Sequence, residues 1–79
     1  MNNRVYVTKG TIARLITGLE CGFIQTEKKE AVFFHRNELV DVSYGSLRGG
    51  QQVELEVIHT LKGLKAVNVR LARQKWHPA

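Results

Sequence analysis

The chain lacks the cysteine pairs of disulfide-bonded proteins and the long apolar runs of membrane-spanning proteins. Its 79 residues include a single cysteine, Cys21, and a single proline. One cysteine excludes an intrachain disulfide framework and a multi-cysteine zinc site, and a chain without disulfides is typical of a reducing compartment. The sequence also has no apolar run of bilayer length and no signal-peptide core. We therefore expect one small domain over residues 1–79, located in the cytoplasm and with no membrane partner.

The charge is unbalanced in favour of cations. Twelve lysines and arginines face seven acidic residues, which gives a formal net charge of +5 and a pI near 9.8. The basic residues are spread along the chain and form no polybasic block, a pattern that favours a folded surface with phosphate contacts over a membrane-binding tail. The charge therefore favours nucleic acid as a partner, although net positive charge also serves solubility alone.

Apolar and polar residues alternate with a period of two in five segments, and no segment has a convincing helical period. The expected strands cover a first stretch from Val5 to Ile16 that is interrupted at Gly10, and then about 21–26, 31–36, 51–59 and 66–71. A loop over 40–50 follows the third strand, and its Leu47 is expected to pack back onto the core. The ordered part should run from about residue 4 to 72, with 73–79 as a flexible tail.

In so short a chain, closing the sheet protects its edges. The sequence therefore predicts an all-β fold, a five-stranded antiparallel Greek-key barrel of OB type, with an SH3-like barrel as the structural alternative. The inward positions of the strands predict a core made of Ile12, Ile24, Val32, Phe34, Val53, Leu55, Val57, Val67, Val69 and Leu71.

The segment from Cys21 to Arg36 carries the strongest functional pattern. Alternation places Ile24, Val32 and Phe34 on one face of the sheet and Phe23, Phe33 and His35 on the other. Cys21 falls on the Phe23 face. If that face is exposed, its rings form a surface on which nucleic-acid bases can stack. Alternation alone leaves open which face is inside, since most phenylalanines are core residues.

Several short motifs, in their order and spacing, resemble a cold-shock domain over about residues 10–71. The motifs are Gly10-Thr11-Ile12, Cys-Gly-Phe-Ile at 21–24, Val-Phe-Phe-His at 32–35, Ser-Leu-Arg-Gly-Gly-Gln at 46–51, Val-Glu-Leu-Glu-Val at 53–57, and Lys62-Gly63 followed by Ala-Val-Asn-Val at 66–69. The resemblance implies a five-stranded OB barrel that binds single-stranded RNA or DNA through outward aromatic side chains. It also implies that Phe34 is inside and Phe33 outside.

The resemblance further implies a set of binding residues. Tyr44 matches a loop aromatic that stacks on bases in the family, and Lys62 matches a basic residue before the fifth strand. The chain departs from the family where Arg14-Leu15 replaces a Trp-Phe pair and Arg36 replaces an aromatic. Cys21 likewise replaces an aromatic, and Leu19 a lysine. The expected interface therefore consists of Phe23, Phe33, His35 and Tyr44 as stacking groups and Arg14, Arg36, Lys9 and Lys62 as phosphate contacts or stacking planes.

Fewer aromatic faces and more guanidinium groups move the expected binding from stacking toward charge. We therefore expect weaker affinity and a steeper salt dependence than in a relative with the full set of aromatics.

Catalysis is not expected from this sequence. The three histidines have no metal-ligand spacing, and no cofactor motif is present, so we expect neither metal nor cofactor. Cys21 and His35 fall on adjacent expected strands, but an exposed sheet face supplies neither an oxyanion hole nor exclusion of water.

The sequence thus predicts a non-enzymatic binder of single-stranded nucleic acid, acting as an RNA chaperone or as a regulator of transcription or translation. An OB domain acting in translation is a variant of that reading. The alternative is a protein-interaction module that kept the barrel and lost the ligand, with Leu15, Ile16 and Leu19 as an exposed apolar patch.

Overall fold

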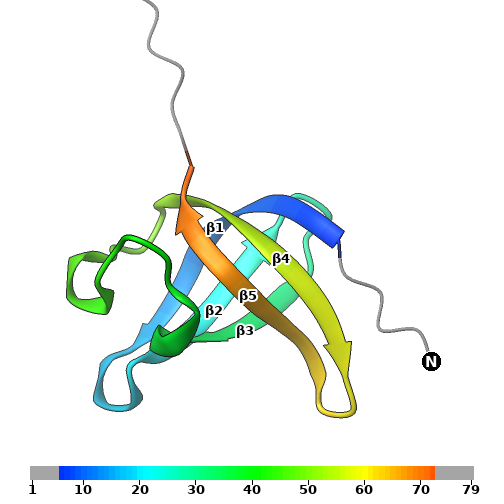
Figure 1. The fold of residues 1–79 in the computed structure, drawn as a ribbon, viewed down its shortest axis with the longest axis horizontal. Helices are drawn as coiled ribbons and strands as arrows, with labels where there is room; N and C mark the ends of the chain where they lie inside the picture. The colour runs from blue at the N-terminus through cyan, green and yellow to red at the C-terminus, as the bar shows by residue number, and fades with distance from the viewer. Residues whose placement is uncertain (1–5, 73–79) are drawn as a thin grey trace, which may run out of the picture.

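Five strands carry the fold of residues 6–72, the part of the chain that the computed structural model describes (Figure 1). The strands are β1 (Tyr6–Ile16), β2 (Cys21–Thr26), β3 (Ala31–His35), β4 (Gln52–Thr60) and β5 (Gly63–Leu71). Single 3₁₀ turns cover Thr17–Leu19, Arg36–Glu38 and Tyr44–Ser46, the last of them inside the long loop. The expected tail at 73–79 lies outside the described residues.

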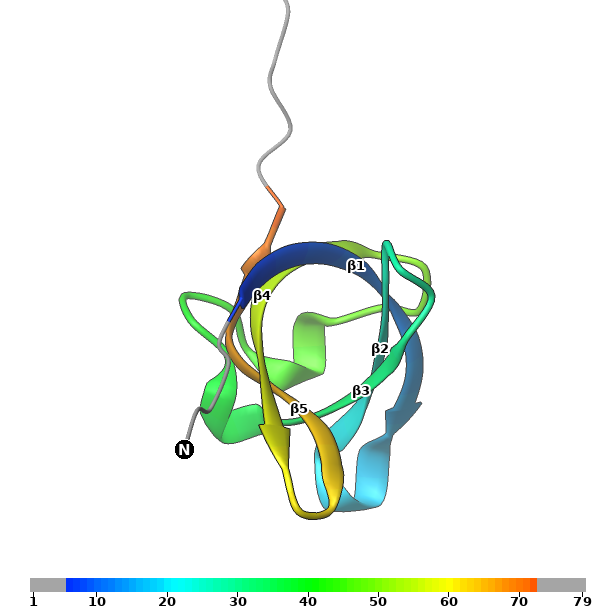
Figure 2. The same ribbon diagram turned by 90° about the vertical axis from the view of Figure 1, so that its right-hand side faces the viewer.

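The strands close into a barrel in the order β1-β2-β3-β5-β4, with β4 returning to β1 (Figure 2). Neighbouring strands pair antiparallel except for β3 and β5, which are parallel and share one register pair, Phe33 with Lys65. Within residues 6–72 the structure contains no α-helix. The predicted five-stranded OB-type barrel is therefore confirmed, and its closing contact is a short parallel one.

Gly10 lies where β1 changes partner. The first half of β1 pairs with β4, the second half pairs with β2, and Gly10 belongs to both ladders. A Cβ atom at Gly10 would stand 2.6 Å from Ile24 Cγ2 and 2.8 Å from the Gln25 carbonyl oxygen. Glycine therefore permits the close approach that lets one long strand serve both sides of the barrel.

The core confirms most of the inward positions predicted from alternation. Phe34 is fully buried, whereas Phe33 is only half-buried, so the face assignment is confirmed. Leu47 is also buried, as expected for a loop residue that packs back onto the core. The buried apolar cluster consists of Ile12, Ile24, Val32, Phe34, Leu47, Val53, Leu55, Val57, Ala66 and Val69.

The inward prediction is wrong at two positions of β5. Val67 is half-buried, and its neighbour Ala66 is fully buried in its place; Leu71 is exposed. At Val67 the cause is a bulge: between the pairs Glu54 with Arg70 and Glu56 with Val67, β5 has one residue more than β4. Leu71 keeps its register with the buried Val53 but is the last residue of β5, where it is exposed. Asn68, inside the bulge, has φ 50°, a left-handed conformation that breaks the alternation.

This conformation makes a prediction about stability. Asn68→Val should lower the free energy of unfolding by about 1–2 kcal/mol, because a β-branched side chain is disfavoured in the left-handed region. Asn68→Gly, the matched control, keeps that region accessible and should cost less than about 1 kcal/mol. Urea denaturation of the three proteins measures both values, and equal losses for the two variants would show that the backbone conformation does not matter.

Candidate nucleic-acid interface

Four side-chain positions form a row across the outer surface of the barrel. Arg14 on β1 pairs with Phe23 on β2, Phe23 pairs with Phe33 on β3, and Phe33 pairs with Lys65 on β5. A bulge between Ile12 and Arg14 brings Arg14 into register with Phe23. Strands are about 4.8 Å apart, so the cross-strand row spans roughly 14 Å. Two aromatic rings therefore lie between a cation on β1 and a cation on β5.

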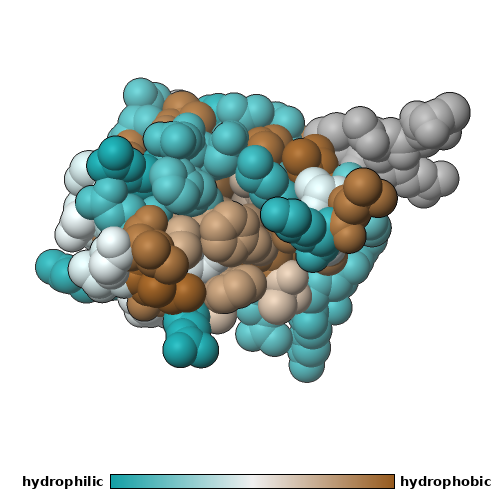
Figure 3. Space-filling view, turned by 90° about the horizontal axis from the view of Figure 1, so that it is seen from below, coloured by the Kyte–Doolittle hydropathy of each residue, from teal (hydrophilic) through white to brown (hydrophobic). Residues whose placement is uncertain are grey.

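The two rings of the row touch edge to face. The centroids of Phe23 and Phe33 are 5.8 Å apart and their planes meet at 69°. Both side chains are half-exposed and line an open groove of about 760 Å³, together with residues 60–65 of the hairpin between β4 and β5. We call this the aromatic groove. Viewed from below, this side of the barrel shows hydrophobic surface in its middle, bordered by hydrophilic atoms (Figure 3). Each ring can thus offer its own face to a flat partner.

His35 is paired with Cys21, two register pairs from Phe23 and Phe33 along the β2–β3 ladder. Its Nδ1 accepts a hydrogen bond from the backbone N–H of Asn37 at 3.2 Å and so caps the 3₁₀ turn Arg36–Glu38. Because Nδ1 is the acceptor, the ring is in the tautomer that carries its proton on Nε2. The cap fixes the ring beside the aromatic pair, a role that the sequence did not indicate.

Cys21 differs from the expectation that it occupies an exposed position. Its side chain is only 4% exposed, although it follows the alternation of the Phe23 face. Tyr44 from the long loop lies over this region: its hydroxyl donates to the Cys21 carbonyl oxygen at 2.7 Å, and its ring packs on Phe34 at 6.4 Å between centroids. The loop therefore covers the start of β2, which alternation within the strand cannot predict.

Tyr44, like His35, is a predicted stacking residue that does not line the aromatic groove. It is half-buried and packed against the core cluster. Partial burial raises the pKa of its hydroxyl above the ordinary 10.0, and the nearby Cys21 thiol adds to the rise. Its contacts give it a structural role, at the point where the long loop is attached to the barrel.

Arg36 is exposed but paired. Its guanidinium is 2.6 Å from a carboxylate oxygen of Glu20, and its backbone N–H donates to the Glu20 carbonyl oxygen at 3.0 Å. Glu20 and Arg36 directly flank the Cys21–His35 pair, so the ion pair continues the β2–β3 ladder by one step. The sequence pointed to Arg36 but gave no sign of Glu20 as its partner.

The lysines fall into two groups. Lys62, a predicted contact residue, lines the aromatic groove, and so does Lys65, which the sequence did not indicate. Lys65 reaches this place through the parallel contact between β3 and β5, which joins residues far apart in the chain and leaves no local pattern.

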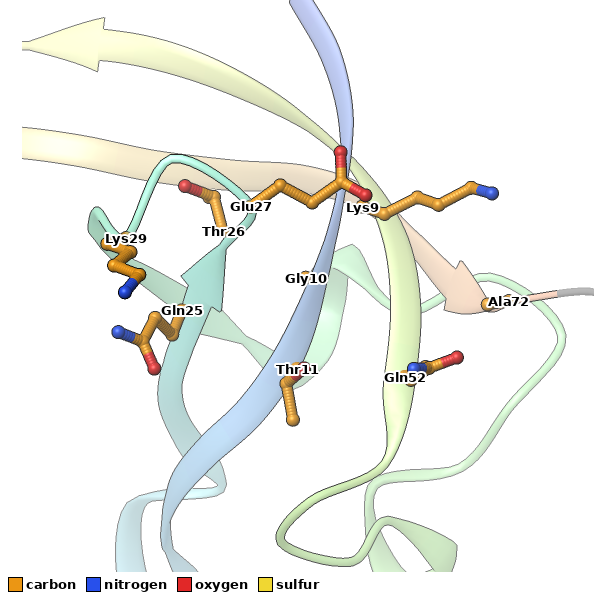
Figure 4. A pocket seen from close by; sticks show the side chains of 9 residues that line it. All are labelled: Lys9, Gly10, Thr11, Gln25, Thr26, Glu27, Lys29, Gln52 and Ala72. Atoms are coloured by element: carbon orange, nitrogen blue, oxygen red, sulfur yellow. The ribbon is translucent and has the colours of Figure 1, made fainter.

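Lys9 instead lines a different pocket, of about 370 Å³, where its side chain points away from Gln25 and Lys29 (Figure 4). It is in register with Glu54 across β1 and β4 and does not line the aromatic groove.

Polar groups of the loop between β2 and β3 form hydrogen bonds with one another and with Tyr6. The Tyr6 hydroxyl donates to Glu30 Oε1 at 2.6 Å, and the ammonium of Lys28 lies 5.0 Å from the centre of the Tyr6 ring. The Thr26 hydroxyl oxygen accepts from the backbone N–H groups of Lys28 and Glu30. This loop therefore offers fewer free groups to a ligand than the groove does.

The described residues show no sign of a metal centre, since no three histidine, cysteine or acidic side chains among them come together. Within the same residues, no helix has the length and hydrophobicity needed to cross a membrane.

A closed five-stranded barrel that displays aromatic side chains from two adjacent strands is an OB-type fold with a cold-shock pattern of residues. The family model of the 'Cold-shock' DNA-binding domain matches residues 8–72, and the chain belongs to that family. Over 48 residues it is 40% identical to cold shock-like protein CspC of Bacillus cereus, a match that covers 61% of this chain and 74% of that one. It is 42% identical to cold shock protein CspA of Staphylococcus aureus, with 61% and 73% covered.

Solved structures agree with the fold. The drosophila Unr CSD456 chain superposes with a TM-score of 0.71 at 27% identity; the match covers 92% of this chain and only 29% of that one. Apo-CusF from Escherichia coli has a TM-score of 0.60 at 8% identity, with 91% and 92% covered, and shows a likeness of fold alone.

The raised pKa of Tyr44 makes a prediction about pH. A hydroxyl whose pKa is higher in the folded than in the unfolded state stabilises the fold while it is protonated, and this contribution is lost as pH rises above about 10. Tyr44→Phe should therefore lower the free energy of unfolding by about 1 kcal/mol at pH 7 through the lost hydrogen bond.

Above pH 10 the difference should shrink, since only the parent loses stability by ionisation of Tyr44. Unfolding curves at pH 7 and above pH 10 measure this. Both proteins keep Tyr6, whose pKa is also raised through its hydrogen bond to Glu30, so the comparison isolates Tyr44. A difference that is constant with pH would contradict the assignment.

Proposed function

We propose that this protein binds single-stranded RNA or DNA in the aromatic groove, without catalysing a reaction. The observation that carries the proposal is the cross-strand row: two half-exposed phenylalanines in contact, with Arg14 at one end and Lys65 at the other. Membership of the cold-shock DNA-binding family supports it. The names of the relatives in Bacillus and Staphylococcus, which describe cold shock proteins, agree with it.

The row suits unpaired bases better than a duplex. Bases of a single strand are free to leave one another and lie on protein rings, whereas in a duplex their faces are already stacked. Because Phe23 and Phe33 meet edge to face, each ring takes a separate base, and His35 offers a further face two register pairs along the β2–β3 ladder. The phosphates between these bases are then near Arg14, Lys62 and Lys65, the cations that lie along the row or line the groove.

In this proposal the remaining predicted contact residues, Lys9 and Tyr44, lie outside the aromatic groove. Lys9 reaches a phosphate only if the strand continues past the groove toward the other end of β1, and Tyr44 offers the exposed part of its ring beside the start of β2. A protein of this kind acts as an RNA chaperone by mass action, because binding the unpaired strand shifts the pairing equilibrium. Action in the cytoplasm remains the expectation from the single cysteine.

One titration tests the proposal directly. Fluorescently labelled pyrimidine and mixed-sequence single strands, as RNA and as DNA, are titrated with the protein at two salt concentrations, each beside its matching duplex. We expect saturable binding of the single strands and weaker binding of the duplexes. Binding that is equal for both forms would indicate charge attraction without stacking and would contradict the use of the groove.

A substitution in the row gives the first prediction on affinity. Phe33→Ala should weaken binding roughly 5- to 150-fold, because one base–aromatic stack is worth about 1–3 kcal/mol. Lys29→Ala is the control: Lys29 is exposed on the β2–β3 loop, outside the groove, and a single screened charge should matter less. Equal losses for the two variants, or none for Phe33→Ala, would place binding elsewhere on the barrel.

Salt dependence gives the second prediction. Contacts to three or four phosphates correspond to a slope of roughly −2 to −3 for log affinity against log salt, at about −0.7 for each phosphate of a single strand. Arg14→Phe should flatten this slope by about 0.7 and should not weaken binding at high salt, because it exchanges a charge contact for a stacking face. A variant with the parent's slope would show that Arg14 does not contact the backbone.

The exposed leucines favour a second candidate, a protein-interaction module. Leu19 is 69% exposed at the turn after β1, and Leu61, which lines the aromatic groove, is fully exposed at the tip of the β4–β5 hairpin. Leu15 and Ile16, expected to extend this patch, are half-buried. Absence of binding to every single strand at low salt would reject the nucleic-acid proposal and favour this candidate.

A further inference from the structure

The ion pair between Glu20 and Arg36 has a fixed place at one end of the proposed binding surface. Glu20 takes a left-handed conformation with φ 54°, and its backbone N–H donates to the Thr17 carbonyl oxygen at 3.2 Å. On the other strand, the His35 ring holds the turn that begins at Arg36. The backbones of both residues are thus held, so the carboxylate and the guanidinium face one another before any ligand arrives.

The ion pair between Glu20 and Arg36 makes this end of the proposed binding surface less attractive to a phosphate. A guanidinium that already contacts a carboxylate must give up that contact, wholly or in part, to bind a phosphate oxygen. The carboxylate also repels a phosphate at short range. The pair is well exposed, with side-chain exposures of 57% and 45%, so it is weak enough for a ligand to displace.

We propose that Glu20 restrains nucleic-acid binding by occupying Arg36, so that Arg36 contributes little to affinity while the carboxylate is present. This inference rests on the proposed function and assigns to Glu20 a part in setting the strength of that binding. In its unrestrained form the surface would have one more phosphate contact, beside His35. An affinity for nucleic acid that is inferred from the number of cations alone would therefore be too high for this barrel.

The proposal makes a directional prediction for Glu20→Gln. Glutamine keeps the size of the side chain and removes the charge, so Arg36 becomes available to a phosphate. We expect binding of a labelled single-stranded pyrimidine 12-mer to tighten by roughly two- to fivefold at low salt, the range that corresponds to an exposed ion pair. The slope of log affinity against log salt should steepen by about 0.7, one additional phosphate.

Two matched variants complete the test. Glu56→Gln makes the same change in net charge on β4, where Glu56 pairs with Val7 and Val67, away from the row. Arg36→Gln should change the parent's affinity only slightly, but in the Glu20→Gln background it should abolish the gain. Unfolding curves of every variant confirm that the barrel is intact before affinities are compared.

The outcomes separate the two proposals. A gain for Glu20→Gln that exceeds that of Glu56→Gln and requires Arg36 supports the restraint. A parent that binds, with Glu20→Gln no tighter than Glu56→Gln or weaker than the parent, overturns the restraint and leaves the proposed function standing. A parent and a Glu20→Gln variant that both fail to bind any single strand at low salt overturn the proposed function and the restraint together.

Discussion

The burial of Phe34 is the constraint on which the outer surface of this barrel depends. Phe34 is fully buried and pairs across the strands with Gly22, where a Cβ atom would stand 2.9 Å from the Phe34 ring. Glycine thus lets the ring fill the space under β2. Because side chains alternate, a slip of one residue would turn Phe33 inward and remove the exposed ring pair. The core packing and the candidate site are therefore set by the same register.

Much of this arrangement could be predicted from the sequence. Alternation located five strands, and the resemblance to cold-shock domains decided which face of β2 and β3 is outside. Prediction failed where the local pattern is interrupted or where distant segments meet. The bulge at the left-handed Asn68 turns Val67 away from the core, and Leu71 is exposed as the last residue of β5. Cys21 is buried at the start of β2, where Tyr44 of the long loop is attached. The parallel contact of β3 with β5 brings Lys65 to Phe33.

The positive charge that the candidate surface offers to a ligand depends on the position and acidic partners of each cation as well as on the number of cations. Three of the cations, Arg14, Lys62 and Lys65, lie along the row or in the groove, whereas Arg36 faces an acid. Lys9, although close in sequence to the first motif, lines a different pocket and not the groove. The formal net charge of +5 is therefore a property of the whole chain and does not give the charge of the candidate site.

The cross-strand row also crosses the place where β3 and β5 close the barrel, which we call the seam. The strands β3 and β5 share a single register pair, Phe33 with Lys65, so hydrogen bonds join this seam more sparsely than they join the other neighbouring strands. A nucleic-acid strand that rests on Phe33 and contacts Lys65 would bridge the seam from outside and add to the few backbone contacts that join β3 to β5. Bound nucleic acid would then stabilise the contact between β3 and β5, and these strands would separate less often when the surface above them is occupied.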